Sequence, residues 1–89
     1  MFKNEEVNLK LTDSKLYLSN DPGVWVFICN NVLSINSKKD ILTIVLRGDG
    51  GNLRKIESNF DNWYVRVSCT YAEYDGETNV MIYKFRLLE

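Results

Sequence analysis

The chain contains no histidine among its 89 residues, and this limits the chemistry that its side chains can support. Ser-His and Cys-His nucleophiles and histidine-ligated metals are ruled out. Two cysteines without histidine do not make the usual structural zinc site. Cys29 and Cys69 each end or interrupt an apolar stretch, so we expect both to be buried, reduced thiols. A disulfide between them is the alternative if the protein is secreted.

Carboxylates are the remaining candidates for acid–base chemistry. They lie in the predicted turns and near the chain ends, and we interpret them as turn formers and solvated charge. We therefore expect no enzymatic activity, no cofactor, no metal and no small-molecule substrate. The acidic residues considered are Glu5, Glu6, Asp13, Asp21, Asp40, Asp49, Asp61, Asp75 and Glu77.

The glycine-rich stretch RGDGGN, residues 47–52, could suggest a phosphate-binding loop, but it lacks the GK[ST] ending that such a loop requires. Its first three residues also spell the tripeptide that integrins recognise. We interpret this as a coincidence, since no secretory signal is evident. Asp49 and Asn52 alone do not make a calcium loop. We expect a flexible turn here.

Composition is typical of one small soluble domain, with 45% apolar residues, 26% charged residues and a net charge of −1. The near-neutral charge argues against a protein that coats duplex DNA. No apolar run approaches the roughly 20 residues that span a bilayer. The N-terminus lacks the apolar block of a signal peptide, so we expect a cytoplasmic protein with no membrane contact.

Alternating apolar residues predict that the chain is built from β-strands. Residues 7–11 and 16–18 alternate on either side of a short polar turn, which predicts an N-terminal hairpin. Residues 24–35 are a long β-branched and aromatic run, predicted to be buried on both sides in its first half. Asn30 and Asn31 interrupt that run, and we expect a β-bulge or a sharp bend there.

Further strands follow this run. A polar turn at 36–40 leads to a buried strand at 41–46, and a short strand is expected at 53–57. Two longer ribbons then flank a turn within residues 63–87. Because no segment keeps helical periodicity, the sequence predicts an all-β chain.

The last hairpin carries its bulky apolar residues at odd positions in both ribbons. Directly opposed residues share a face, so a two-residue loop at Asp75-Gly76 would set apolar residues opposite charged ones. We therefore predict a three-residue loop, 74–76, with Gly76 in the left-handed conformation. The predicted pairs are Cys69 with Met81, Val67 with Tyr83 and Val65 with Phe85, and the core side also carries Trp63 and Tyr71.

This strand order resembles the OB-fold, a partly open five-stranded Greek-key barrel. The resemblance covers residues 24–89 and implies a first strand bent to join both sheets, with residues 1–21 as an added N-terminal β-hairpin. The stretch between Glu57 and Trp63 leaves no room for the usual helix. We expect a single domain, a small antiparallel barrel of five to seven strands, with a small β-sandwich as the alternative.

An OB-like barrel implies a ligand surface on the second and third strands and the loops 36–40 and 74–76. Lysine and arginine side chains together with an exposed aromatic ring on this surface would suit single-stranded nucleic acid. The cations would bind the phosphates, and the ring would stack on a base. The alternative interpretation is that these cations only keep a small β protein soluble. The candidate residues are Lys38, Lys39, Arg47, Arg54, Lys55 and Tyr74.

A second candidate surface is the outward side of the last hairpin, where apolar residues alternate with charge. This surface is either covered by residues 1–21 or contacts a protein partner or a second copy of the chain. An exposed edge of the last strand could also pair with another chain. Its residues are Tyr64, Arg66, Val80, Ile82, Lys84 and Arg86. The neutral charge favours a protein-binding module or adaptor. In size and composition the chain resembles small phage-encoded inhibitors of host proteins, and single-stranded nucleic-acid binding is the alternative.

Overall fold

The computed structural model describes residues 2–12, 15–21, 25–29, 31–48, 54–57 and 64–88, with side chains at 2–11, 15–19, 31–48 and 64–88. These residues form strands and turns, which confirms the all-β prediction. The strands are β1 (Glu6–Thr12), β2 (Lys15–Asp21), β3 (Trp25–Cys29), β4 (Val32–Lys38), β5 (Ile41–Arg47), β6 (Arg54–Glu57), β7 (Val65–Asp75) and β8 (Val80–Leu87).

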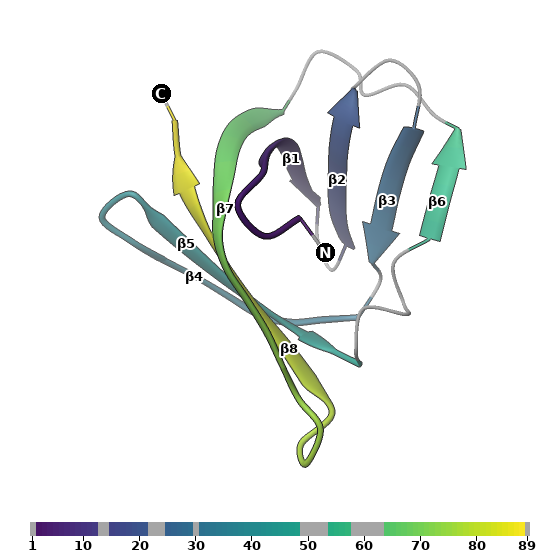
Figure 1. The fold of residues 1–89 in the computed structure, drawn as a ribbon, viewed down its shortest axis with the longest axis vertical. Helices are drawn as coiled ribbons and strands as arrows, with labels where there is room; N and C mark the ends of the chain where they lie inside the picture. The colour runs from purple at the N-terminus through teal and green to yellow at the C-terminus, as the bar shows by residue number, and fades with distance from the viewer. Residues whose placement is uncertain are drawn as a thin grey trace.

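All eight described strands belong to one antiparallel sheet, in the order β4-β5-β8-β7-β1-β2-β3-β6 (Figure 1). Six of these strands, β3 to β8, come from the segment predicted to form a barrel of five to seven strands, and the predicted N-terminal hairpin adds the other two. The N-terminal hairpin β1–β2 lies between β7 and β3, so it forms the middle of the sheet. Residues 1–21 are therefore integral to the fold and not an element beside it.

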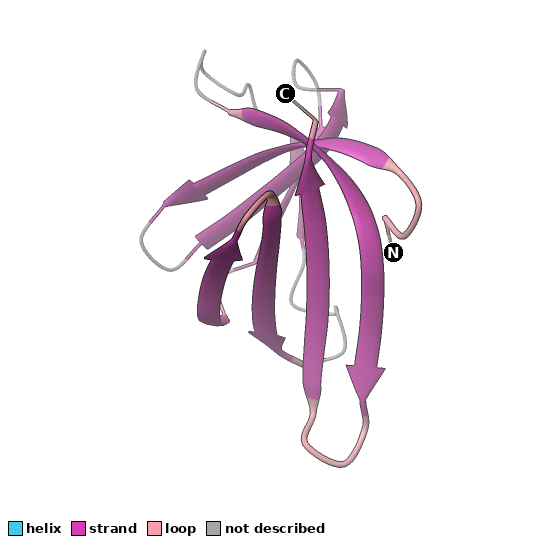
Figure 2. Ribbon diagram, turned by 90° about the vertical axis from the view of Figure 1, so that its left-hand side faces the viewer, coloured by secondary structure: helices cyan, strands magenta, loops and turns pink. Residues whose placement is uncertain are grey.

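The chain connections force this sheet to curl. Strands β3 and β4 are seventh and first in the sheet order, yet only Asn30 and Asn31 separate them in sequence. The three residue-to-residue steps from Cys29 to Val32 reach at most about 11 Å. In a flat sheet, β3 and β4 would be six strand spacings apart, which is about 29 Å. Figures 1 and 2 show the resulting half-barrel. Strand β3 ends at Cys29 and β4 begins at Val32, so the predicted break in the run 24–35 is confirmed.

The core fills the concave side of the half-barrel, because alternate residues of each strand point inward. An N-terminal segment, residues 2–5, also contributes to it. The Asn4 N–H donates to the Cys69 carbonyl at 2.8 Å, and the Cys69 N–H donates to the Glu5 carbonyl at 2.8 Å. This docking brings Phe2 into the core. The buried apolar residues are Phe2, Val7, Leu9, Leu16, Leu18, Ile44, Leu46, Val67, Cys69, Met81, Tyr83 and Phe85.

The predicted register of the last hairpin is wrong. Asp75 pairs with Val80, so the loop comprises residues 76–79 rather than 74–76. Asn79, with φ 58°, takes the left-handed conformation that the sequence assigned to Gly76. Asn tolerates this region better than most residues because its short polar side chain bonds locally. Here the Tyr74 hydroxyl donates to Asn79 Oδ1 at 2.7 Å.

A β-bulge at Thr70 keeps the core residues of the two strands on one face. Cys69 opposes Phe85, but beyond the bulge Ala72 opposes Tyr83. The inward side of β7 therefore changes from odd to even positions, and Tyr71 is exposed instead of buried. The register still keeps the core residues together, as predicted, but a bulge achieves this instead of a three-residue turn.

The hairpin β4–β5 is longer than expected. Residues 36–38 belong to β4 and not to a turn, and Lys38 pairs with Ile41 across the two-residue turn Lys39-Asp40. Lys39 has φ 58°, which a tight two-residue turn requires.

Candidate functional site

The predicted nucleic-acid residues are distributed over distant parts of the sheet. Lys38 and Lys39 lie at the tip of the β4–β5 hairpin, whereas Arg47 ends β5. A seven-residue strand separates the two positions by about 20 Å. The exposed Tyr74 lies at the Arg47 end, because Arg47 and Asp75, the neighbour of Tyr74, both pair with Val80.

Arg54 and Lys55 lie in β6, which is the opposite edge of the sheet from β4. Their backbones pair with Ile28 and Phe27, and their side chains lie outside the described part of the chain. Figure 1 places β6 on the other side of the molecule from the β4–β5 tip. The structure thus does not gather the predicted cations into one groove.

The outward side of β8 is organised differently. Met81, Tyr83 and Phe85 point into the core, so Val80 and Ile82 point to the convex face, where both stay partly exposed. Val45 and Glu73 flank Ile82 in the neighbouring strands, and Arg47 and Asp75 flank Val80 in the same way. Apolar side chains therefore meet with a cation on one side and carboxylates on the other.

Further along β8, cations replace the apolar residues. Lys84 lies between Thr43 and Tyr71, and its Nζ lies 5.0 Å from the centre of the Tyr71 ring. This cation–π contact holds the ring against the sheet. We define the outer patch as this convex surface of β5, β8 and β7. It comprises an apolar centre of Val45, Tyr71, Val80 and Ile82 and a charged rim of Arg47, Glu73, Asp75, Lys84 and Arg86.

The described residues of the N-terminal hairpin, 2–12 and 15–21, do not lie over the outer patch. Strand β1 pairs with the edge of β7 that faces away from β8, and so extends the sheet sideways. Strand β8 itself lies between β5 and β7, so the expectation that its edge is open is wrong. The open edges of the described sheet belong to β4 and β6, each of which has a single neighbour.

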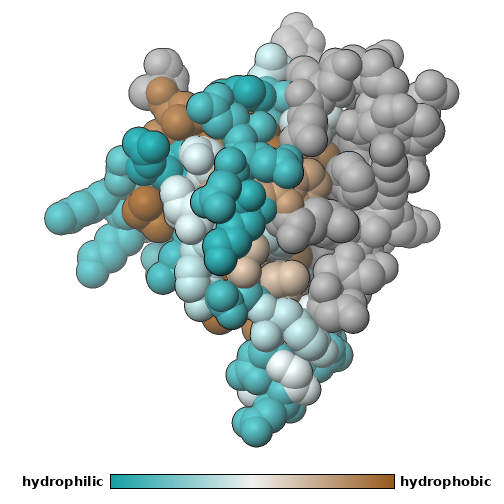
Figure 3. Space-filling view, in the orientation of Figure 1, coloured by the Kyte–Doolittle hydropathy of each residue, from teal (hydrophilic) through white to brown (hydrophobic). Residues whose placement is uncertain are grey.

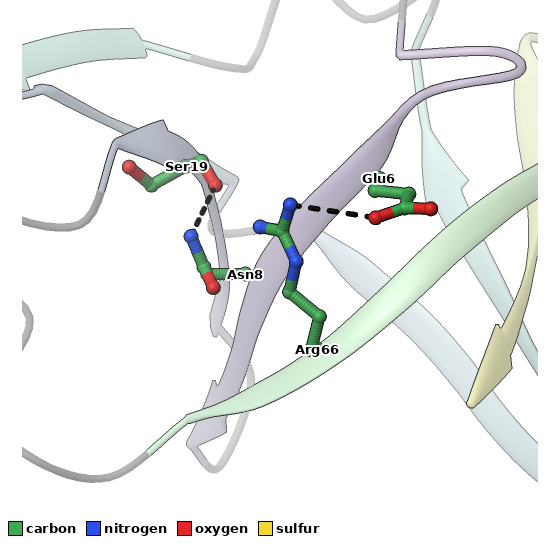
Figure 4. A network of polar contacts seen from close by, with 4 residues as sticks. All are labelled: Glu6, Asn8, Ser19 and Arg66. Carbon is green, nitrogen blue, oxygen red and sulfur yellow. Dashed lines mark hydrogen bonds and ion pairs between the residues drawn. The ribbon is translucent and has the colours of Figure 1, made fainter. Parts of the chain in front are cut away.

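The other two predicted interface residues, Tyr64 and Arg66, lie at the start of β7. Tyr64 is exposed, and an Arg66 nitrogen lies 3.6 Å from Glu6 Oε1 (Figure 4). Beside this ion pair Asn8 is buried, and its Nδ2 donates to the Ser19 carbonyl at 3.1 Å. These contacts tie β7, β1 and β2 together, so Arg66 has a structural role apart from the outer patch.

Sequence reasoning missed Val45 and Tyr71. The sequence predicts a buried strand at 41–46, although Thr43 and Arg47 share alternate positions with Val45 and mark an outward face. That polar alternation was the signal available. Tyr71 gave no such signal, because its orientation depends on the bulge at Thr70.

Cys69 is the nucleophilic side chain of the described core. It is a free, fully buried thiol whose Sγ donates to the Tyr71 carbonyl at 3.6 Å. Burial raises the pKa of this thiol, which keeps it protonated and unreactive. The expectation of a buried reduced thiol is confirmed for Cys69, whereas the Cys29 side chain lies outside the described residues.

Within the described ranges, no three metal-ligating side chains of the His, Cys, Asp and Glu types come together. The same ranges contain no helix long and apolar enough to cross a membrane. Comparison with protein-family models, with curated proteins and with solved structures finds no match to this chain.

Proposed function

We propose that the protein is a small non-enzymatic binding module that contacts a protein partner through the outer patch. The observation that carries this proposal is the position of Val80 and Ile82, which stay partly exposed on the convex face. Val45 lies directly opposite Ile82, and Tyr71 lies opposite the next outward residue of β8, Lys84. Isolated exposed apolar residues need no explanation, but an apolar cluster framed by charge is typical of an interface.

The outer patch has the composition of a recognition surface. Its centre is aliphatic and aromatic, and its rim is charged, as in protein interfaces generally. Charge is also distributed unevenly along the rim. Lys84 and Arg86 lie toward one end of β8, whereas Glu73 and Asp75 lie beside the other end, with Arg47 on the opposite side of Val80. A complementary partner presents carboxylates near Arg86 and cations near Asp75.

The size of the outer patch favours a weak contact. Three neighbouring strands and their side chains span about 15–20 Å, which corresponds to the small end of specific interfaces. Such a contact suits an adaptor or an inhibitor of another protein, including the phage-encoded kind that the chain resembles in size. The OB-like barrel remains the finer fold hypothesis for residues 24–89.

Site-specific cross-linking tests the proposal. A photoreactive phenylalanine analogue replaces Ile82 in the full chain, and the matched control carries it at Glu77, an exposed residue of the 76–79 loop. We expect one identified protein to cross-link from position 82 and not from position 77. In a binding assay with the purified partner, Ile82→Lys should abolish binding. The same substitution should leave the thermal unfolding midpoint within a few degrees of that of the original protein.

The nucleic-acid alternative is the competing outcome. Labelled oligo-dT is titrated at low and physiological salt, with Lys38→Glu and Lys39→Glu as variants. Salt-sensitive binding that these variants weaken, and that Ile82→Lys leaves unchanged, would replace the outer-patch proposal by nucleic-acid binding. A protein that cross-links equally from positions 82 and 77 would also contradict the outer patch.

A further inference from the structure

The two open edges of the sheet differ in how well they are protected against pairing. Strand β6 is four residues long and its sequence RKIE carries three charges. Strand β4, VLSINSK, is seven residues long, contains no proline, and has its only charge at Lys38. Natural proteins protect open edges with short strands, charges, prolines and bulges. Of these features, β6 has the short length and the charges. Besides its single charge, strand β4 has only a bulge, near its start at Leu33, and is therefore the less protected edge.

Strand β4 is also exposed along its length. Residues 33–38 are all exposed, and the two large apolar side chains among them, Leu33 and Ile35, are 47% and 42% exposed. Ile35 pairs with the fully buried Ile44 and so points to the core side of the sheet. The apolar inner surface thus continues to the open edge. Figure 3 shows apolar surface between the polar side chains near the β4–β5 tip.

The hydrogen-bonding groups that β4 leaves open follow from its register. Lys38 and Ile41 close a two-residue turn, so they form a hydrogen-bonded pair. Such pairs alternate along an antiparallel ladder, so Asn36 and Ser34 also bond toward β5. The N–H and C=O groups of Ile35 and Ser37 therefore point to the open edge.

We propose that β4 pairs antiparallel with β4 of a second copy of this chain, around a two-fold axis at Ile35. In this register Ile35 exchanges two backbone hydrogen bonds with Ile35 of the second copy, and their side chains pack on the core side. Lys38 faces Val32 of the second copy, so no like charges are directly opposed. The inner surfaces of the two half-barrels then become continuous.

A second copy fits this edge better than an unrelated peptide. Peptides that add a strand to an edge obtain specificity from side-chain pockets beside it. Beside β4 the inner face is filled by Ile44 and Leu46, both fully buried. Specificity must then come from the strand itself, and a two-fold arrangement satisfies both edges with one contact. This dimer does not involve the outer patch, so the two proposals stand or fall separately.

The mass of the intact protein is measured by light scattering and sedimentation from about 5 µM to about 500 µM, a range that brackets the weak affinity of a small interface. We expect a monomer–dimer equilibrium. Ile35→Lys should raise the dissociation constant at least tenfold, because two ammonium groups meet at the axis. The matched control is Leu87→Lys, which adds the same charge at a 40% exposed leucine of β8, a strand with a neighbour on each side, and should leave dimerisation unchanged.

Two further readouts identify β4 as the contact. Mixing Ile35→Lys with Ile35→Glu should restore the dimer, since opposite charges then meet at the axis. Amide exchange at Ile35 and Ser37 should slow at least tenfold as the protein concentration rises. A monomer at every concentration would overturn the proposal. So would a dimer that Ile35→Lys leaves intact, that shows no rescue on mixing, or that Ile82→Lys disrupts instead.

Discussion

The turn between β7 and β8 depends on a side chain that the sequence pattern did not single out. Asn79 has φ 58°, accepts a hydrogen bond from the Tyr74 hydroxyl, and its carbonyl accepts the Gly48 N–H at 2.8 Å. The nearby Gly76 needs no special backbone freedom, and a Cβ added there would lie 3.8 Å from Tyr74 Cε2, an ordinary contact. The dipeptide Asp-Gly is a strong turn signal, but it does not say which residue takes the left-handed conformation.

Substitution at these two residues separates the observed turn from the predicted one. Asn79→Ala should lower the free energy of unfolding by about 1–2 kcal/mol, since alanine is strained at this φ and lacks the acceptor. Asn79→Gly should lower it less. Gly76→Ala should change it by less than about 0.5 kcal/mol. Urea unfolding measures all three, and a larger loss for Gly76→Ala than for Asn79→Ala would restore the 74–76 loop.

The buried thiol of Cys69 makes stability depend on pH in the alkaline range. Burial raises the pKa of Cys69 above its ordinary value of 9.0, so the folded state holds the proton more tightly than the unfolded state. The buried thiol therefore adds to the free energy of unfolding below pH 9, and this addition is lost as the pH rises above 9. The free energy of unfolding then falls by up to about 1.4 kcal/mol per pH unit. Cys69→Ala should flatten the decline between pH 9 and pH 10 in urea unfolding. Parallel curves for the two proteins would contradict the assignment.

Strand β1 is the element that the sequence described least well. Its alternation predicted one buried side, and Val7 and Leu9 are indeed buried, but Asn8 between them is buried as well. Asn8 lies on the same face as the exposed Glu6, but its own amide is buried and therefore needs a partner inside the protein. Asn8 finds it in the Ser19 carbonyl of β2, which fixes the β1–β2 register.

Removal of the Asn8–Ser19 hydrogen bond should lower the free energy of unfolding more than removal of the adjacent Glu6–Arg66 ion pair. Asn8→Ala should lower the free energy of unfolding by about 1–3 kcal/mol, through the lost hydrogen bond and the space left behind. Glu6→Ala is the matched control on the same face of β1. It removes an exposed pair with Arg66 and should change stability by less than about 1 kcal/mol. Equal effects in thermal unfolding would show that Asn8 is not enclosed in this way.

At the scale of the molecule, the half-barrel depends on a hairpin that sequence reasoning set apart. Because β1 and β2 lie between β7 and β3, deletion of residues 1–21 removes the centre of the sheet. It also removes Phe2 and four other core residues, Val7, Leu9, Leu16 and Leu18. We expect the remaining chain to lack a cooperative unfolding transition in circular dichroism. A cooperative transition would show that residues 24–89 fold alone, as the OB resemblance implies.

The sequence by itself determined the local features of this protein. Alternation with period two is a property of neighbouring residues, so it predicted the all-β class, the N-terminal hairpin, the break at Asn30-Asn31 and the inward side of β8. It also placed Val80 and Ile82 on the outward face. Each of these depends on side chains a few positions apart.

The tertiary structure decided what depends on distant partners. The insertion of β1 and β2 into the sheet, the bulge at Thr70 and the open edge at β4 follow from how strands far apart in the sequence pair. A one-residue change of register reverses every side chain beyond it. Local alternation therefore could not reveal that Tyr71 points outward beside Lys84. Closure of the curled sheet around one core selects the register, and with it the surface left for a partner.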